Sequence, residues 1–234
     1  HRMVASDFNL DRPNDCVWDQ GLWQQIVDLG WTAVCVPEGA GGIGMPAVAA
    51  IVLAEEVGRT AFPSPLIAPL SATFVLNACD SAAATAALTE IAGGKATALA
   101  LTNAEGEWDS AATDVRVNAD GRLDGLAAFV QDARKCAQFI VSARSDAGVG
   151  LYLVSAAADG LTLTPDSVID LTRDQARLTF KQVDAIELAA PGTGSAAIDA
   201  ALPGLLSLVA ADMVGAGEWL LQTTVEYAKT RVQF

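Results

Sequence analysis

The sequence has few of the residues that a metal site or a polyanion-binding surface requires. Its 234 residues include one histidine, at position 1, and four cysteines, none of them in a CxxC pair. Zinc sites are built from closely spaced Cys and His ligands, so we expect no metal site. Basic residues are also scarce: 14 Lys and Arg face 28 Asp and Glu, a formal net charge of −14. Such a surface repels nucleic acid and anionic lipid, which argues against functions that depend on binding either.

Long apolar runs are missing as well. The most apolar stretches, residues 47–54 and 200–211, fall short of the ~20 residues that span a bilayer, so we expect no membrane segment and no signal peptide. The scattered cysteines are typical of reduced thiols and favour a cytoplasmic protein, with Cys35 and Cys79 expected in the core. What the chain does have is core-forming material, since 52% of its residues are hydrophobic and 18% are charged.

The first part of the chain shows the periodicity of amphipathic helices. We predict helices over residues 18–30 and 46–57, a third that opens at residues 65–67, and a fourth over 81–91. Gly30 and Gly58 are expected to end the first two, and Pro46 suits the first turn of the second. Residues 1–94 are therefore assigned to an N-terminal helical domain.

Residues 95–190 change to short runs rich in β-branched side chains, such as "DVRVNA", "FIVSAR" and "GLYLVSA". Asp120-Gly121 between two such runs predicts a hairpin turn. We therefore predict a central antiparallel β-barrel or sandwich domain, within a chain of the α+β multidomain class.

A helical pattern returns over residues 195–234. Pro203 either starts this helix or kinks it. Gly215 and Gly217 each cost about 1 kcal/mol relative to Ala in mid-helix, so we expect another helix or a ligand to approach closely there. The pattern reaches Phe234 without a stop signal. We interpret it as the first helix of a C-terminal helical-bundle domain whose remainder lies outside this chain.

The stretch "GWTAVCVPEGAGGIGM", from Gly30 to Met45, is a glycine cluster that follows an apolar run. It lacks the GK[ST] of a phosphate-binding P-loop, and the segment before it is expected to be a helix, not a strand. We predict residues 39–44 to be a surface turn between two helices, remote from Thr102 and Phe129.

Three motifs follow one another along the chain. The first is "LWQQIVDLGWTAVCVPEGAGGIGM" with the later "AEEVGR". The second is "LALTNAEGEWD" with "LDGLAAFVQDARKCAQFIVSAR", and the third is "AADMVGAGEWLLQTTVEYAKTRVQF". Together they resemble the acyl-CoA dehydrogenase family over nearly the whole chain.

The resemblance implies an FAD-dependent oxidoreductase that converts an acyl-CoA thioester to its trans-2-enoyl-CoA. It also implies an electron-transfer flavoprotein as electron acceptor, a role in fatty acid metabolism, and assembly into homo- or hetero-oligomers, dimers or tetramers. Acyl-chain specificity is not implied.

The same resemblance assigns cofactor contacts to the second motif. Thr102 matches the threonine of the family's "TEP.AGSD" loop, which binds the flavin pyrimidine edge, and Leu99 and Leu101 would lie under the ring. Trp108 does not match the family's sequence motif for this loop. Its side chain could stack on a ligand, plug the acyl entrance, or point away as a half-buried aromatic of the β domain.

Two further positions match the family's flavin-contacting strand. Phe129 falls on its usual tryptophan and Gln131 on its usual threonine. Phe keeps a π surface without an indole N–H, and Gln keeps a hydrogen-bond donor and acceptor. The alternative is an ordinary strand whose Phe129 packs in the core.

The third motif ends with Arg231 and Phe234, which match an Arg and a Phe that in relatives reach the FAD of an adjacent subunit. An Arg fork suits a pyrophosphate, and the i, i+3 spacing would put both on one helix face. The alternative for Arg231 is a solvated residue that favours the helix dipole. We assign no catalytic residue, because no carboxylate of this chain matches the family's general base.

Two other interpretations of the sequence remain open. The departures around Trp108, Phe129 and Gln131 also suit a non-catalytic partner subunit of a heteromeric acyl-CoA dehydrogenase, which contributes FAD contacts and an assembly surface. The other reading is an unrelated protein with a helix, strand, helix order.

Overall fold

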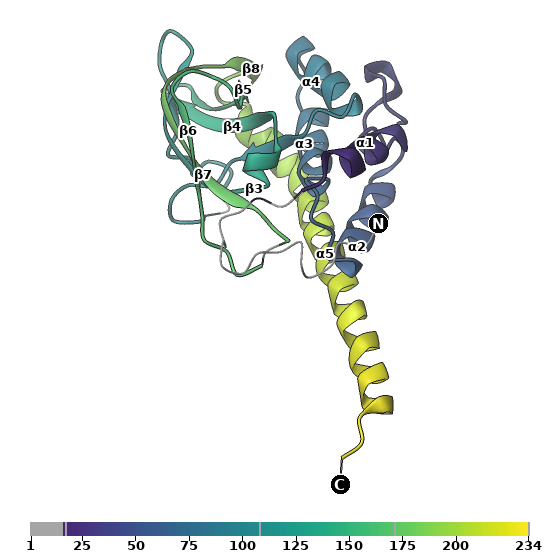
Figure 1. The fold of residues 1–234 in the computed structure, drawn as a ribbon. Coiled ribbons are helices and arrows are strands. Elements are labelled where there is room, and N and C mark those ends of the chain that lie inside the picture. The colour runs from purple at the N-terminus through teal and green to yellow at the C-terminus, as the bar shows by residue number, and fades with distance from the viewer. Residues whose placement is uncertain (1–15, 17, 108, 171, 234) are drawn as a thin grey trace.

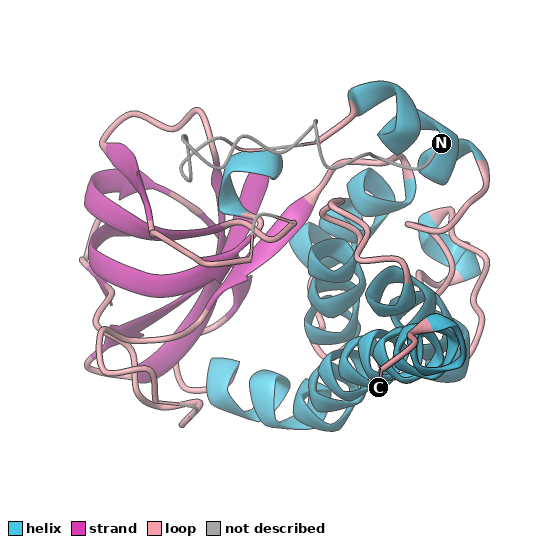
Figure 2. Cartoon of the chain, turned by 60° about the horizontal axis from the view of Figure 1, so that its bottom comes forward, coloured by secondary structure: helices cyan, strands magenta, loops and turns pink. Residues whose placement is uncertain are grey.

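The computed structural model describes residues 16, 18–107, 109–170 and 172–233. Helices and strands form two bodies that lie side by side, and the long helix α5 (Gly194–Thr230) runs along both (Figure 1). Turned by 60°, Figure 2 shows the strands gathered on one side and the helices on the other. The observed order of helices, strands and a final helix confirms the predicted α+β class.

The N-terminal region contains the four predicted helices. Each helix end that the sequence predicted lies within two residues of the observed end. Asp19 and Ser81 cap the first and fourth, since each side-chain oxygen accepts a backbone N–H, from Leu22 and Ala84 respectively, at 3.1 Å. The helices are α1 (Gln20–Asp28), α2 (Ala47–Arg59), α3 (Ile67–Asn77) and α4 (Ala82–Ala92).

The crossing of α2 and α5 corrects two expectations about glycines. Gly58 does not end α2 but lies inside it, and a Cβ there would come within 1.9 Å of the Asp212 carbonyl oxygen of α5. A Cβ at Gly215 would come within 1.9 Å of the Glu55 carbonyl oxygen, which confirms the predicted close approach. Gly217 has nothing within 4 Å of such a Cβ, so the same prediction is wrong for it.

The central region is a single mixed sheet that does not close into a barrel. Its strand order is β6-β7-β3-β2-β4-β5-β8, and β1 pairs with β4 off this path. Most pairs are antiparallel, but β1 and β2 each pair with β4 in parallel, which corrects the expectation of a purely antiparallel domain. The strands are β1 (Thr97–Ala100), β2 (Arg116–Val117), β3 (Arg122–Gln131), β4 (Gln138–Ser145), β5 (Gly148–Ser155), β6 (Leu161–Pro165), β7 (Gln175–Asp184) and β8 (Ile186–Ala189).

The predicted hairpin joins β2 and β3. Gly121 has a φ of +77°, which glycine adopts without strain, and the Asn118 side chain accepts the N–H groups of Asp120 and Arg122 at 2.9 and 3.0 Å. The glycine cluster after α1 is the predicted surface turn between two helices. It contains the 3-10 turn η2 (Glu38–Ala40), followed by Gly41 and Gly44 at φ values of +82° and +70°.

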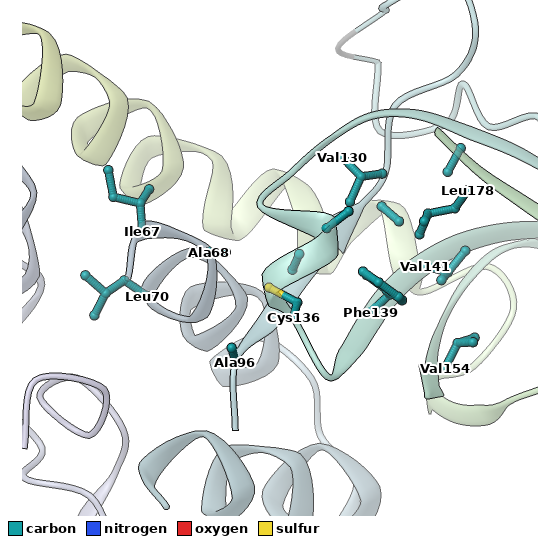
Figure 3. Close-up of a cluster of buried hydrophobic side chains, with 14 of the residues drawn as sticks. Ile67, Ala68, Leu70, Ala96, Val130, Cys136, Phe139, Val141, Val154 and Leu178 are labelled. Atoms are coloured by element: carbon teal, nitrogen blue, oxygen red, sulfur yellow. The ribbon is translucent and has the colours of Figure 1, made fainter. Parts of the chain in front are cut away.

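The buried core joins the helices to the sheet. Figure 3 labels Ile67 and Leu70 of α3 on one side of this core, and Phe139 and Val141 of β4 with Leu178 of β7 on the other. Cys136 and Ala96 lie between the two sides (Figure 3). The core is therefore shared between regions that the sequence separates.

Helix α5 changes character along its length. Pro203 lies inside it and does not start it, and its N-terminal half packs on α2, α3 and β5. Its C-terminal part extends beyond the rest of the chain (Figure 1), with Met213, Trp219, Leu220 and Tyr227 exposed. By length and composition alone α5 could cross a bilayer, with a mean hydropathy of 1.6 in its most apolar window. One third of that window is buried, where α5 packs on these elements.

Candidate functional site

A cavity of about 460 Å³ lies between the sheet and helices α3 and α5. Its helix-side wall is apolar and includes Ile67, Ala68, Ile198, Leu205 and Val209. No residue of the turn at 39–44 lines it, in agreement with the structural role predicted for that turn.

The end of β1 supplies three of the predicted contacts. Leu99 in β1 and Leu101 just after it are two residues apart along extended chain, so both side chains face the cavity. Thr102 follows them and forms a bridge to β3, where its carbonyl oxygen accepts the Ala128 N–H at 2.9 Å. These three residues therefore lie together in the cavity wall, and their contact with FAD stays a prediction.

A bulge in β3 directs Phe129 and Gln131 to the same cavity. The register with β7 shifts between Ala127 and Val130, so Ala128 and Val130 are buried while Phe129 is 47% exposed. Phe129 has a φ of +55°, a conformation that costs a bulky residue free energy and that clusters at functional sites. The alternative in which Phe129 packs in the core is therefore wrong.

The loop after Thr102 carries negative charge to the cavity. The Glu107 carboxylate accepts a hydrogen bond from the Asn103 amide at 2.7 Å, and the Glu107 N–H donates to Asn103 Oδ1 at 3.0 Å. Glu107 and Asp109 both line the cavity, together with Gly106 beneath the Phe129 ring. Trp108 lies outside the described residues, so its role stays a prediction.

Arg231 does not line this cavity. Arg231 follows the last residue of α5 with extended backbone, so the helix-face argument from i, i+3 spacing does not hold for it. Its guanidinium lies 5.8 Å from the centre of the Tyr227 ring, in the part of α5 that extends away from the sheet (Figure 1). Phe234 lies outside the described residues. Contact with an adjacent subunit stays a prediction for both.

A second cavity of about 300 Å³ adjoins the first, and the two share Ile67, Gln131, Gln175 and Val209 in their walls. Gln175 is a site residue that the sequence analysis missed. It is the cross-strand partner of Gln131 in the pairing of β3 with β7. No local signal marks it, because only the register of two strands 40 residues apart brings the two amides together.

Ion pairs surround the second cavity. Asp174 pairs with Arg134 at 2.5 Å, and Arg173 pairs with Asp212 of α5 at 2.6 Å. Asp132 is buried and pairs with Lys135 at 2.8 Å. Burial raises the pKa of Asp132 above its ordinary value, and the Lys135 ammonium only partly offsets this.

The first cavity fits the flavin ring of FAD better than it fits the rest of the cofactor. Leu99, Leu101 and the Phe129 ring offer apolar surface, while the Thr102 hydroxyl and the Gln131 amide offer polar groups for a ring edge. None of the described residues that line this cavity is Lys or Arg. A pyrophosphate would therefore need cations from outside this cavity.

Known proteins resemble this chain in sequence and in fold. Residues 8–100 match the N-terminal domain of the acyl-CoA dehydrogenases. The chain is 32% identical to acyl-CoA dehydrogenase IpdE2 of Mycobacterium tuberculosis over 94% of its own length, and 27% identical to IpdE2 of Mycolicibacterium smegmatis over 93%. It spans 57% and 56% of the lengths of those two relatives.

Solved structures of acyl-CoA dehydrogenases share the fold of this chain. The Tcur3481-Tcur3483 steroid ACAD superposes with a TM-score of 0.81 at 31% identity, over 92% of this chain and 59% of that one. Butyryl-CoA dehydrogenase from Megasphaera elsdenii superposes with a TM-score of 0.80 at 26% identity, over 96% and 64%. The motifs, the fold and these relatives agree, and the chain belongs to the acyl-CoA dehydrogenase family.

Proposed function

We propose that this chain is the acyl- and flavin-binding part of an FAD-dependent acyl-CoA dehydrogenase, which oxidises the Cα–Cβ bond of an acyl-CoA to the trans-2-enoyl-CoA. The observation that carries the proposal is that the sheet and helices α3 and α5 line one cavity. Thr102, Phe129 and Gln131 come to it from the sheet, and the apolar side chains of α3 and α5 form its opposite wall.

Each wall has a distinct task in this proposal. Bound FAD supplies the acceptor for the hydride that leaves Cβ. Phe129, Leu99 and Leu101 hold the flavin ring and exclude water from it, while Thr102 and Gln131 hydrogen-bond its polar edge. The side chains of α3 and α5 hold the acyl chain against the ring. Removal of the α proton requires a positioned base, which we assign to a part of the protein outside this chain.

The experiment is a single turnover with the full-length protein. We expect about one FAD per chain after purification, and bleaching of the flavin absorption when an acyl-CoA is added without oxygen. Retention of FAD without bleaching by any acyl-CoA of short, long or polycyclic type would contradict the proposal.

Glu107 and Asp109 support a second candidate, a non-catalytic partner subunit of a heteromeric acyl-CoA dehydrogenase. Carboxylates in a cavity wall that offers no cation disfavour the FAD pyrophosphate. This candidate expects no FAD when the subunit is purified alone, and FAD when it is co-purified with a catalytic relative. By family analogy we further propose an electron-transfer flavoprotein as electron acceptor, dimeric or tetrameric assembly, and a cytoplasmic location.

A further inference from the structure

We propose that the second cavity is a subsite for a neutral, hydrogen-bonding substituent, such as a hydroxyl or keto group, on the distal part of the acyl group. This inference rests on the proposed function, because it takes the first cavity as the acyl site. It adds the chemical class of the acyl group, which the family alone does not fix.

The two cavities form a path along one wall. Ile67 of α3 and Val209 of α5 line both, so an apolar group held by these helices in the first cavity leads directly into the second. The second cavity is much more polar: Ile67, Val168 and Val209 are its apolar lining residues, while the other seven are Asp, Arg or Gln. A plain alkyl end would displace water there and give no hydrogen bond in return.

The charged groups of this cavity are already engaged. Asp132, Asp174 and Asp212 each pair with a cation, and the Asp170 carboxylate accepts hydrogen bonds from the N–H and hydroxyl of Thr172 at 2.9 and 2.7 Å. The cations are matched by these carboxylates, so a further carboxylate on the ligand would meet Asp170 without a free positive partner. The cavity therefore disfavours an anionic substituent.

Two amides are left to bind a ligand. The side chains of Gln131 and Gln175 have no hydrogen-bond partner among the residues that the structure describes, and they lie opposite each other where the cavities meet. Each amide has two N–H donors and an oxygen with two lone pairs, so Gln131 can hydrogen-bond the flavin edge and still join Gln175 in binding a hydroxyl or a carbonyl, without any change of charge. A site built to hydrogen-bond a substituent discriminates against ligands that lack it, because its own groups are then left unpaired.

The test uses the full-length protein and β-thia acyl-CoA thioesters, which have no Cβ–H to lose. An even-chain series from hexanoyl to hexadecanoyl is compared with the same series carrying an ω-hydroxyl or an ω-carboxylate, and each Kd is measured by calorimetry. At the chain length that reaches the subsite, we expect the ω-hydroxy form to bind roughly tenfold more tightly than the plain form. The ω-carboxy form should bind more weakly than the ω-hydroxy form.

Two variants locate the effect. Gln175→Ala should bring the ratio of the ω-hydroxy and plain Kd values close to one, while Gln25→Ala, an exposed glutamine on α1, should leave the ratio unchanged. Asp212→Asn frees the Arg173 guanidinium inside the cavity and should shift the preference toward the ω-carboxy form.

The outcomes separate the two proposals. If the plain forms bind as tightly as the ω-hydroxy forms at every length, or if Gln175→Ala keeps the preference, the subsite is wrong and the proposed function stands. If no acyl-CoA of any series binds, the proposed function fails and the subsite fails with it.

Discussion

Gly58 of α2 and Asp212 of α5 meet backbone against backbone, so closely that a Cβ on Gly58 would overlap the Asp212 carbonyl oxygen at 1.9 Å. The same Asp212 holds Arg173 of the loop before β7 through an ion pair at 2.6 Å. One residue of α5 thus connects the N-terminal helices, the last helix and the sheet.

Substitutions at this crossing give the first prediction. Gly58→Ala or Gly215→Ala forces α2 and α5 apart, because the added methyl group meets backbone rather than a flexible side chain. We expect each to lower the free energy of unfolding in urea by about 2–3 kcal/mol. Gly217→Ala is the matched control: it has open space in the same helix and should raise stability by about 0.5–1 kcal/mol. Equal effects at Gly215 and Gly217 would contradict the close contact.

The ion pair of the buried Asp174 with the partly buried Arg134 gives the second prediction. Asp174 is 3% exposed, and its carboxylate accepts the Arg134 Nε–H at 2.6 Å and the Arg134 backbone N–H at 3.0 Å. Asp174→Ala should cost about 3–5 kcal/mol in urea unfolding, since it leaves a partly buried cation without this partner. Asp184→Ala, which breaks the exposed pair with Arg122, should change stability by less than about 1 kcal/mol.

Phe129 gives the third prediction, which separates stability from ligand binding. Phe129→Gly relieves a strained φ but also removes the contacts of a half-buried side chain, and because the two effects oppose each other we expect the stability of the FAD-free protein to change by no more than about 1 kcal/mol. FAD affinity should fall by roughly tenfold with the loss of the ring contact. Phe129→Trp keeps an aromatic surface and should retain FAD. Loss of stability without loss of FAD affinity in Phe129→Gly would assign the residue to packing alone.

Cys79 gives the fourth prediction, on alkaline pH. Burial raises the pKa of its thiol from 9.0 to about 11. Between these values the unfolded chain releases the thiol proton and the folded chain retains it, so this group lowers the free energy of unfolding as pH rises. Cys79→Ala should show a shallower loss of stability between pH 9 and pH 11 in urea titrations than the unsubstituted protein. An identical slope would mean that the thiol titrates normally in the fold.

Local signals in the sequence were enough for most secondary structure. Apolar periodicity placed α1 and α4, and Asp120-Gly121 marked a hairpin, because each signal depends on a few neighbouring residues. The glycines divide by a different rule. Gly215 and Gly217 lie two residues apart in one helix, but only Gly215 faces a distant helix, and no periodicity reveals such a partner.

The site residues also divide into those that a local sequence pattern reveals and those that only the fold brings into place. Thr102, Phe129 and Gln131 were found through motif resemblance, because the family keeps a recognisable pattern around them. Gln175 was missed, since its place beside Gln131 depends on the β3–β7 register and on a bulge that no short motif encodes. The parallel pairing of β1 with β4 was missed for the same reason: it joins segments about 40 residues apart.

The shared core also bears on the order in which the chain can fold. Ala50, Ala54 and Val57 of α2 are buried in the same cluster as Leu208 and Ala211 of α5, although the entire sheet lies between them in sequence. Contacts at such a separation form late, because a long loop must close first. During synthesis, the residues matched as an N-terminal domain would leave the ribosome well before their main helical partner. A unit that sequence comparison treats as a domain is here one half of a packing interface, completed only when α5 has been made.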